Sequence, residues 1–259
     1  MPRIDAYLIA GGKWHDINFA RLEVLKLLHE DDDVRVRVGE DYSDTEAIAA
    51  ADFLISYTCD VHPTVEEQEN VRDFVASGKR WFALHATNSV MEFRADGVHC
   101  PRDYPILMET LGSQFIAHPA IEPYPITVSE SAKDHPLVAG IEPWQCEDEL
   151  YLSEYHGEII PLMETRFSGD SGPGFTEHEW PDDEPRLVMY LHPVGAGEVL
   201  YLTPGHRRSK YDMQDPPLSV PEWPVPELGA WAEPTYYELL RRGIEWAKEP
   251  TRAAAAAAG

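Results

Sequence analysis

Histidines recur where short apolar segments end, and this is the feature of the sequence that most directly suggests chemistry. His15, His85 and His206 each follow a segment with the composition of a β-strand. An imidazole with its usual pKa near ~6.5 can accept or donate a proton at neutral pH, and a neutral imidazole also binds divalent metals. We therefore take these three histidines as the candidate catalytic residues. A lone histidine after a strand also has a structural interpretation, as a group that hydrogen-bonds the fold.

Carboxylates and aromatic rings near these histidines are the candidate ligand-binding groups. The acidic turn Asp148-Glu149 and the residues around His15 supply most of them, and His118 precedes a proline that fixes an extended turn. The predicted substrate-binding residues are Trp14, Asp16, His118, Asp148 and Glu149.

No known metal-binding spacing connects the three histidines, because the sequence contains no H-E-x-x-H. A site built from histidines of separate strands and a carboxylate would nevertheless suit zinc or a similar divalent ion. Histidines that contact a ligand through hydrogen bonds alone are the other interpretation. The metal content therefore stays unknown from the sequence.

The elements that must position these residues alternate between strand and helix in the first third of the chain. Apolar runs predict strands, periodic runs predict helices, and Thr64-Val65-Glu66-Glu67 is a capping box that opens a helix. The strands are 4–10, 34–38, 51–57 and 81–84, and the helices are 17–29 and 64–78. This alternation predicts a mainly parallel sheet flanked by helices, with ligands bound at the carboxyl ends of its strands.

The second half of the chain has a different pattern. We expect added antiparallel strands at 124–129, 149–152, 186–192 and 198–203, with Gly195-Ala196-Gly197 joining the last two as a hairpin. The proline-rich arm 214–234 cannot be a helix or a central strand, so we expect it to cover the pocket mouth or a neighbouring subunit. A closing helix at 236–247 precedes a low-complexity, alanine-rich tail at 251–259. We expect residues 1–250 to form a single α/β domain.

Charge and composition exclude several classes of function. The net charge is −25, with 46 acidic residues against 21 basic ones, so the chain should repel nucleic acid and anionic membranes. The three cysteines form no C-x-x-C pair, which indicates a reducing compartment. With no targeting segment in view, we expect a cytoplasmic protein that acts on a small molecule, and we leave open a homo-oligomer.

Short blocks in order along nearly the whole chain resemble the ThuA-like, or trehalose utilisation, proteins. The opening Gly11-Gly12-Lys13-Trp14-His15-Asp16 is similar to the GG-x-x-HD of that family, and the turn Asp148-Glu149-Leu150-Tyr151 is similar to its DE-[IL]-Y. The remaining blocks are 78–86, 111–115, 118–119, 135–137, 140–141, 197–203, 205–206 and 242–247. The chain departs from the family where Arg207, rather than aspartate, follows Gly205-His206.

The resemblance implies a flavodoxin-like sheet of the class I glutamine amidotransferase type. In those enzymes a cysteine occupies the turn at which this chain has His85, so we do not expect glutamine hydrolysis. The resemblance further implies a sugar substrate, a disaccharide or a 3-keto-glycoside. General acid–base chemistry, with or without a metal, would then isomerise, eliminate or hydrolyse that sugar, with His85 as base or ligand and Trp14 or Trp144 stacked on a sugar face. The alternative is a non-catalytic sugar-binding or regulatory protein on the same scaffold.

Overall fold

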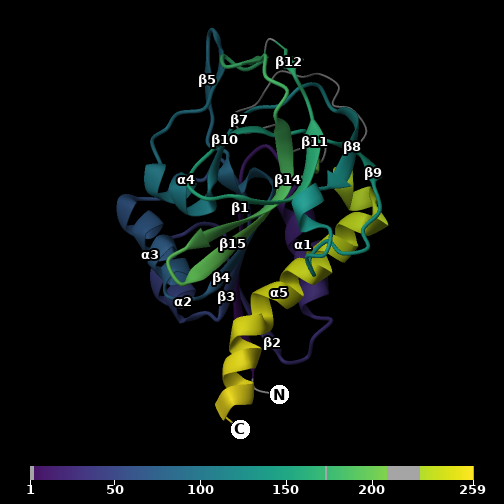
Figure 1. Ribbon diagram of the computed structural model, residues 1–259. Coiled ribbons are helices and arrows are strands. Elements are labelled where there is room, and N and C mark those ends of the chain that lie inside the picture. The colour runs from purple at the N-terminus through teal and green to yellow at the C-terminus, as the bar shows by residue number, and fades with distance from the viewer. Residues whose placement is uncertain (1–2, 173, 209–227, 259) are drawn as a thin grey trace.

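Nine strands form one mixed sheet in the computed structural model, which describes residues 3–172, 174–208 and 228–258 (Figure 1). The strand order is β2-β1-β3-β4-β15-β14-β11-β8-β9. The first five strands run parallel and the last four pairings are antiparallel. The flavodoxin-like class, a mainly parallel sheet extended by antiparallel strands, is confirmed.

The parallel half is built from strands that read as apolar runs. Its members are β1 (Ile4–Gly12), β2 (Val34–Gly39), β3 (Phe53–Cys59), β4 (Arg80–Leu84) and β15 (Gly197–Leu202). Every residue of β3 is buried, because helices cover both faces of the central sheet. In β2 valine alternates with arginine, since this strand forms the edge and one of its faces is wet.

Helices cover the two faces of the sheet and create two cores (Figure 1). One core packs α1 (Ile17–Leu28) and α5 (Pro234–Ala258) on the sheet. The other packs α2 (Thr45–Ala50), α3 (Val65–Ala76) and α4 (Pro105–Leu111) on the opposite face. Thr64 and Glu67 form the predicted capping box, which fixes where α3 begins.

The antiparallel half contains β8 (Glu122–Val128), β9 (Trp144–Asp148), β11 (Ile160–Arg166) and β14 (Pro185–Val194). The predicted hairpin of β14 and β15 is present. The predicted strand 149–152 is wrong. Asp148 ends β9, Leu152 begins β10 (Leu152–Tyr155), and the residues between them form a turn that directs Glu149 inward.

Three small pairs of strands lie outside the main sheet. They are β5–β6 (Glu92–Arg94 and Gly97–His99), β7–β10 (Ser113–Ala117 with Leu152–Tyr155) and β12–β13 (Gly169–Asp170 and Glu179–Trp180). The short segments η1 (His85–Asn88), η2 (Glu130–Ala132) and η3 (Gly229–Ala232) are 3-10 turns. Figure 1 shows β5 and β12 at the same end of the molecule.

The end of the chain contains the closing helix and the proline-rich arm. The closing helix does not stop at Ala247 but continues through the alanine-rich tail to Ala258, since alanine has the highest helix propensity. Most of the proline-rich arm, including Trp223, lies outside the described residues. Its last part is described, and there Trp231 is buried against Phe19 and Tyr57. No described helix is long and apolar enough to cross a membrane.

Candidate active site

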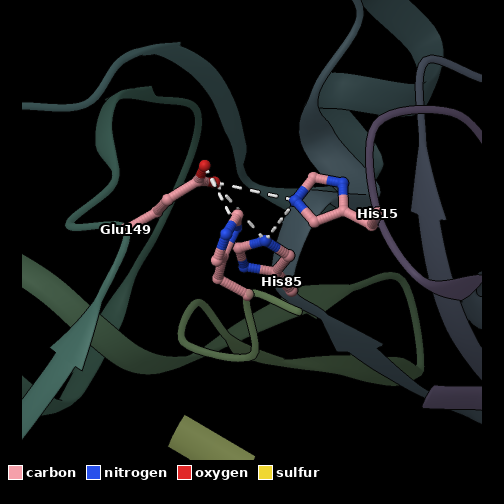
Figure 2. Close-up of side chains that lie close together, drawn as sticks. His15, His85 and Glu149 are labelled. Atoms are coloured by element: carbon pink, nitrogen blue, oxygen red, sulfur yellow. Dashed lines mark hydrogen bonds and ion pairs between the residues drawn. The ribbon is translucent and has the colours of Figure 1, made fainter. Parts of the chain in front are cut away.

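Four buried side chains converge at the carboxyl edge of the parallel strands. His15, His85, His206 and Glu149 each offer one nitrogen or oxygen, and these four atoms lie within 4.8 Å of one another. His15 Nε2 lies 2.9 Å from His85 Nε2, and Glu149 Oε2 lies 3.7 Å and 3.6 Å from these two nitrogens. Figure 2 shows His15, His85 and Glu149 pointing toward one another. We call these four residues the His3Glu cluster.

His85 is held by an unusual backbone conformation directly after β4. Its φ is +45°, which is rare outside glycine and turns the side chain toward the strand ends. Two hydrogen bonds hold His85 in place. Its ring donates from Nδ1 to Thr203 O at 2.8 Å, and its backbone carbonyl accepts from Tyr201 Oη. Strain of this kind persists where the surroundings determine the conformation, and it is common at functional sites.

His15 is placed by the tight end of β1. Gly12 has a φ of +103°, and a Cβ on it would lie 1.8 Å from Cys59 O, so only glycine allows β1 and β3 to approach this closely. Lys13 N then donates to Cys59 O at 2.9 Å. Trp14 also has a positive φ, of +67°, and the two turns together direct His15 back over the sheet edge.

Asp148 fixes the turn that carries Glu149 and the loop that carries His206. Its buried carboxylate accepts hydrogen bonds from the backbone N–H groups of Glu149 (2.8 Å), Gly205 (3.1 Å), His206 (3.1 Å) and Ala230 (2.6 Å). The Nδ1 of His206 lies 3.1 Å from Glu149 Oε1. Three distant segments are therefore joined at one carboxylate.

Burial sets the protonation states within the cluster. It lowers the pKa of His15 and lowers that of His85 well below its usual range, so both rings are neutral. Burial alone would raise the pKa of Glu149, but the His206 and His118 imidazoles beside it hold that pKa well below its usual range. The cluster thus combines the neutral imidazoles of His15 and His85 with an ionised carboxylate, which are the forms that bind divalent metals.

A cavity of about 170 Å³ opens next to the cluster. His15, Glu149 and His118 contribute polar groups, and Nε2 of His118 lies 3.5 Å from Glu149 Oε1. The other lining residues are mostly aromatic or apolar: Trp14, Ser89, Met91, Phe93, Val98, Phe115, Tyr151, Phe175 and Arg208. We call this cavity the site pocket.

The structure gives two of the predicted substrate-binding residues other positions. Asp16 caps α1, where its Oδ1 accepts a 3.1 Å hydrogen bond from Phe19 N, and Asp148 bonds backbone groups. Neither lines the site pocket, because a short carboxylate after a strand is easily taken up by nearby N–H groups. Trp144 lies on β9 and does not line the pocket either. Trp14, His118 and Glu149 do line it.

Sequence reasoning missed the aromatic wall of the pocket. Tyr151, whose Oη lies 3.4 Å from His85 Nε2, follows the acidic turn by two residues and could have been found from that spacing. Phe93, Phe115 and Phe175 come from the small strand pairs and from the loop between β12 and β13. These segments carry no sequence signal that places them beside the cluster.

The cysteines take no part in the site. Cys59, Cys100 and Cys146 are buried free thiols. Burial raises the pKa of Cys100 to about 12 and raises the other two pKa values further above their usual range. A thiol with so high a pKa carries almost no thiolate at neutral pH and is a poor nucleophile.

The comparisons with known proteins agree on one family. The profile described as trehalose utilisation (ThuA) matches residues 8–217. No curated protein matches the chain. A ThuA-like protein from Parabacteroides merdae superposes with a TM-score of 0.59 at 16% identity, over 95% of this chain and 90% of that one. One from Bacteroides uniformis gives 0.64 at 15% identity, over 95% and 91%. Such identities show a shared fold, whereas the profile match shows the family: the chain belongs to the trehalose utilisation (ThuA) family.

Proposed function

We propose that this protein is an enzyme of carbohydrate metabolism that binds a divalent metal in the His3Glu cluster and transfers a proton on a neutral sugar held in the site pocket. Membership of the trehalose utilisation family supports the sugar substrate. The buried His3Glu cluster beside a largely aromatic pocket supports the chemistry.

One observation carries the metal assignment, namely the contact between the two imidazoles. His85 Nδ1 donates to Thr203 O, and a carbonyl only accepts, so in the neutral ring Nε2 holds a lone pair. His15 Nδ1 faces Lys13 O at 3.4 Å, and when it donates there its Nε2 holds a lone pair as well. The two lone pairs then face each other at 2.9 Å, an arrangement that a cation beside both nitrogens stabilises; in the other tautomer of His15, Nε2–H donates to His85 Nε2.

The spacing of the four ligand atoms also suits a metal. With metal–ligand bonds of about 2.0–2.1 Å, a tetrahedral zinc site has ligand atoms about 3.3 Å apart. Four contacts within the cluster run from 2.9 Å to 3.7 Å, through both oxygens of Glu149, and the four ligand atoms all lie within 4.8 Å of one another. Three imidazoles with one carboxylate are the nitrogen and oxygen donors that zinc and similar divalent ions accept.

Proton transfer falls to residues that face the pocket. Nδ1 of His118 donates to Pro119 O at 2.7 Å, which leaves Nε2 as the basic nitrogen on the pocket side. His118 is also more exposed than the cluster histidines, so it can exchange protons with solvent. We assign His118 as the acid–base residue. His15, His85, His206 and Glu149 are assigned as the metal ligands, and through the metal they would orient the substrate oxygens. A bound divalent ion would polarise a sugar carbonyl and stabilise an enolate.

The reaction class follows from this arrangement. A ketone acidifies its neighbouring C–H, so one base and one polarising group suffice to isomerise a 3-keto-glycoside or to eliminate its aglycone. Elimination breaks the glycosidic bond and leaves a double bond next to the ketone, and addition of water to that double bond would complete a net hydrolysis. The three buried free thiols support a reducing, cytoplasmic location as part of the same proposal.

Metal content tests the first half of the proposal. Elemental analysis of protein purified without a histidine tag should find about one equivalent of a divalent metal. After chelation, zinc titration by calorimetry should show one site, which Glu149→Gln or His206→Ala weakens at least ~100-fold, more than the loss typical of residues around the ligands. The matched controls are Glu158→Gln and His29→Ala, at exposed residues that do not belong to the cluster. Substoichiometric metal together with full activity after chelation would overturn the metal assignment.

Turnover tests the second half. The protein is incubated with a panel of disaccharides and their 3-keto derivatives, with and without chelator, and the products are followed by NMR. We expect turnover of at least one 3-keto-glycoside that chelation abolishes and zinc restores. Sugar binding without any turnover would instead assign the protein as a binding or regulatory member of the family.

A further inference from the structure

The site pocket is too small for a disaccharide. Its volume is about 170 Å³. A protein cavity of about 150 Å³ accommodates one six-membered ring such as benzene. One pyranose ring can therefore lie against the His3Glu cluster, and any unit joined to that ring must lie outside the pocket.

An exposed aromatic side chain stands at the place where such a unit would emerge. Phe93 lines the pocket yet is 53% exposed, whereas its neighbour Trp14 is only 6% exposed. The two ring centroids are 4.8 Å apart at an interplanar angle of 48°, so Trp14 supports Phe93 from behind. What singles out Phe93 among the exposed apolar side chains is its place at the pocket, where a ligand that extends beyond the cavity would cover its apolar face.

The segment that carries Phe93 is fixed rather than free. Phe93 belongs to β5, and the paired strand β6 is bonded to a segment far along the chain: Val98 N donates to Gly174 O at 2.9 Å, and Thr176 N donates to Val98 O at 3.0 Å. The same crossing places Phe175 in the pocket wall. A surface already held in place loses little conformational entropy when a ligand binds.

The charges around Phe93 favour a neutral ligand. Arg94 is paired with Glu92 through a 2.9 Å hydrogen bond from Nε, so the cation beside Phe93 is neutralised. Among the described residues that line the pocket, Arg208 is the one cationic side chain and Glu149 contributes a carboxylate. Hydroxyl-rich rings with apolar C–H faces suit such a surface better than phosphorylated ones.

We propose that Phe93, supported by Trp14, is an outer binding site for the second unit of a neutral glycoside whose first ring occupies the site pocket. This inference rests on the proposed function and adds the size of the substrate and the residue that selects it. The protein should therefore prefer a two-unit glycoside over the corresponding single ring.

The test compares the affinities of the protein, as purified with its metal, for α,α-trehalose, maltose and sucrose with that for methyl α-D-glucopyranoside. We expect the best disaccharide to bind about tenfold more tightly than the single ring, a difference of about 1.4 kcal/mol. Phe93→Ala should weaken binding of the disaccharide more than binding of the single ring and so remove this difference, while Phe93→Tyr should keep it. Leu22→Ala is the matched control, because Leu22 is also 53% exposed but lies on α1.

Each outcome separates this inference from the proposed function. Equal affinity for one ring and two rings in the wild type, or a difference that survives Phe93→Ala, overturns the outer site and leaves the proposed function standing. A dimer that dissociates on Phe93→Ala, measured by light scattering, reassigns the surface to contact between copies of the chain. The same titrations are made with the 3-keto derivatives, and failure of every sugar of both sets to bind overturns the proposed function and the outer site together.

Discussion

Gly205 is a position at which one added methyl group should disturb both the fold and the site. It lies between the end of β15 and His206, and its φ of +137° belongs to a region that residues with a Cβ rarely adopt. A Cβ built there would lie 2.5 Å from Tyr236 Oη and 3.2 Å from His85 Cβ. Gly205→Ala therefore combines backbone strain with a clash against two buried side chains.

The magnitude follows from these two contributions. Holding a residue with a Cβ in such a backbone region lowers the free energy of unfolding by about 1–3 kcal/mol. Displacing Tyr236 also removes its 3.1 Å hydrogen bond to Pro204 O, which contributes about 1 kcal/mol. The sum is about 3 kcal/mol, which for a chain of this size lowers the melting temperature by about 6–12 °C.

Urea unfolding of matched variants separates strain from clash. Gly169 has a φ of +113° with no atom within 4 Å of a built Cβ, so Gly169→Ala should show strain alone. In the Tyr236→Phe background, Gly205→Ala should cost about 1 kcal/mol less, because the clashing oxygen is gone. The displaced His206 should also weaken zinc binding in Gly205→Ala. If Gly205→Ala proves no more destabilising than Gly169→Ala, the close approach at Gly205 is not real and the reasoning fails.

Three further predictions concern the site and one distant ion pair. His118→Gln should lower kcat about 10²–10⁴-fold with an unchanged metal content; a loss of metal would instead make His118 a ligand. Chelation should lower the melting temperature, since a metal present at 100 times its Kd stabilises the folded state by about 2.7 kcal/mol; an unchanged melting temperature would contradict the site. Lys248, whose Nζ lies 2.8 Å from Asp31, lowers the pKa of that carboxyl, so the folded state binds the proton less readily than the unfolded state. The destabilisation by Lys248→Met should therefore be fully present above pH ~4, the usual pKa of aspartate, and should shrink as the pH falls through the lower pKa of Asp31 in the folded state. The measurement is denaturant unfolding at several pH values, and equal destabilisation at all of them would contradict this prediction.

The convergence of the site could be predicted because it follows from topology. Carboxyl ends of parallel strands meet at one edge, so residues just after β1, β4 and β15 had to lie near one another wherever the strands were recognised. Helix boundaries with a capping box, as at Thr64, were equally local and equally predictable. These features depend on short stretches of sequence together with the order of a few strands.

The features that the sequence did not predict depend on contacts between segments far apart in the chain. Nothing near Asp148 shows that its carboxylate will bond the N–H groups of Gly205 and Ala230, more than fifty residues away. The strand predicted at 149–152 failed for the same reason, because Tyr151 is buried in the pocket wall while Leu150 packs into the core beneath α1 and α5. The pocket wall, with Phe175 held through β6, is likewise set by tertiary contacts alone.

The cost of the His3Glu cluster is itself an argument for what it binds. Four polar side chains are buried at one point, and two imidazole nitrogens lie 2.9 Å apart. His85 is kept at a positive φ while its ring donates a hydrogen bond to Thr203 O and its carbonyl accepts one from Tyr201 Oη. An N–H···N hydrogen bond between His15 and His85 accounts for the 2.9 Å contact, but not for a third imidazole and a carboxylate at the same point. In the proposed function a divalent cation would use these four side chains as its ligands, and the aromatic pocket beside them leaves room for one ring of a sugar.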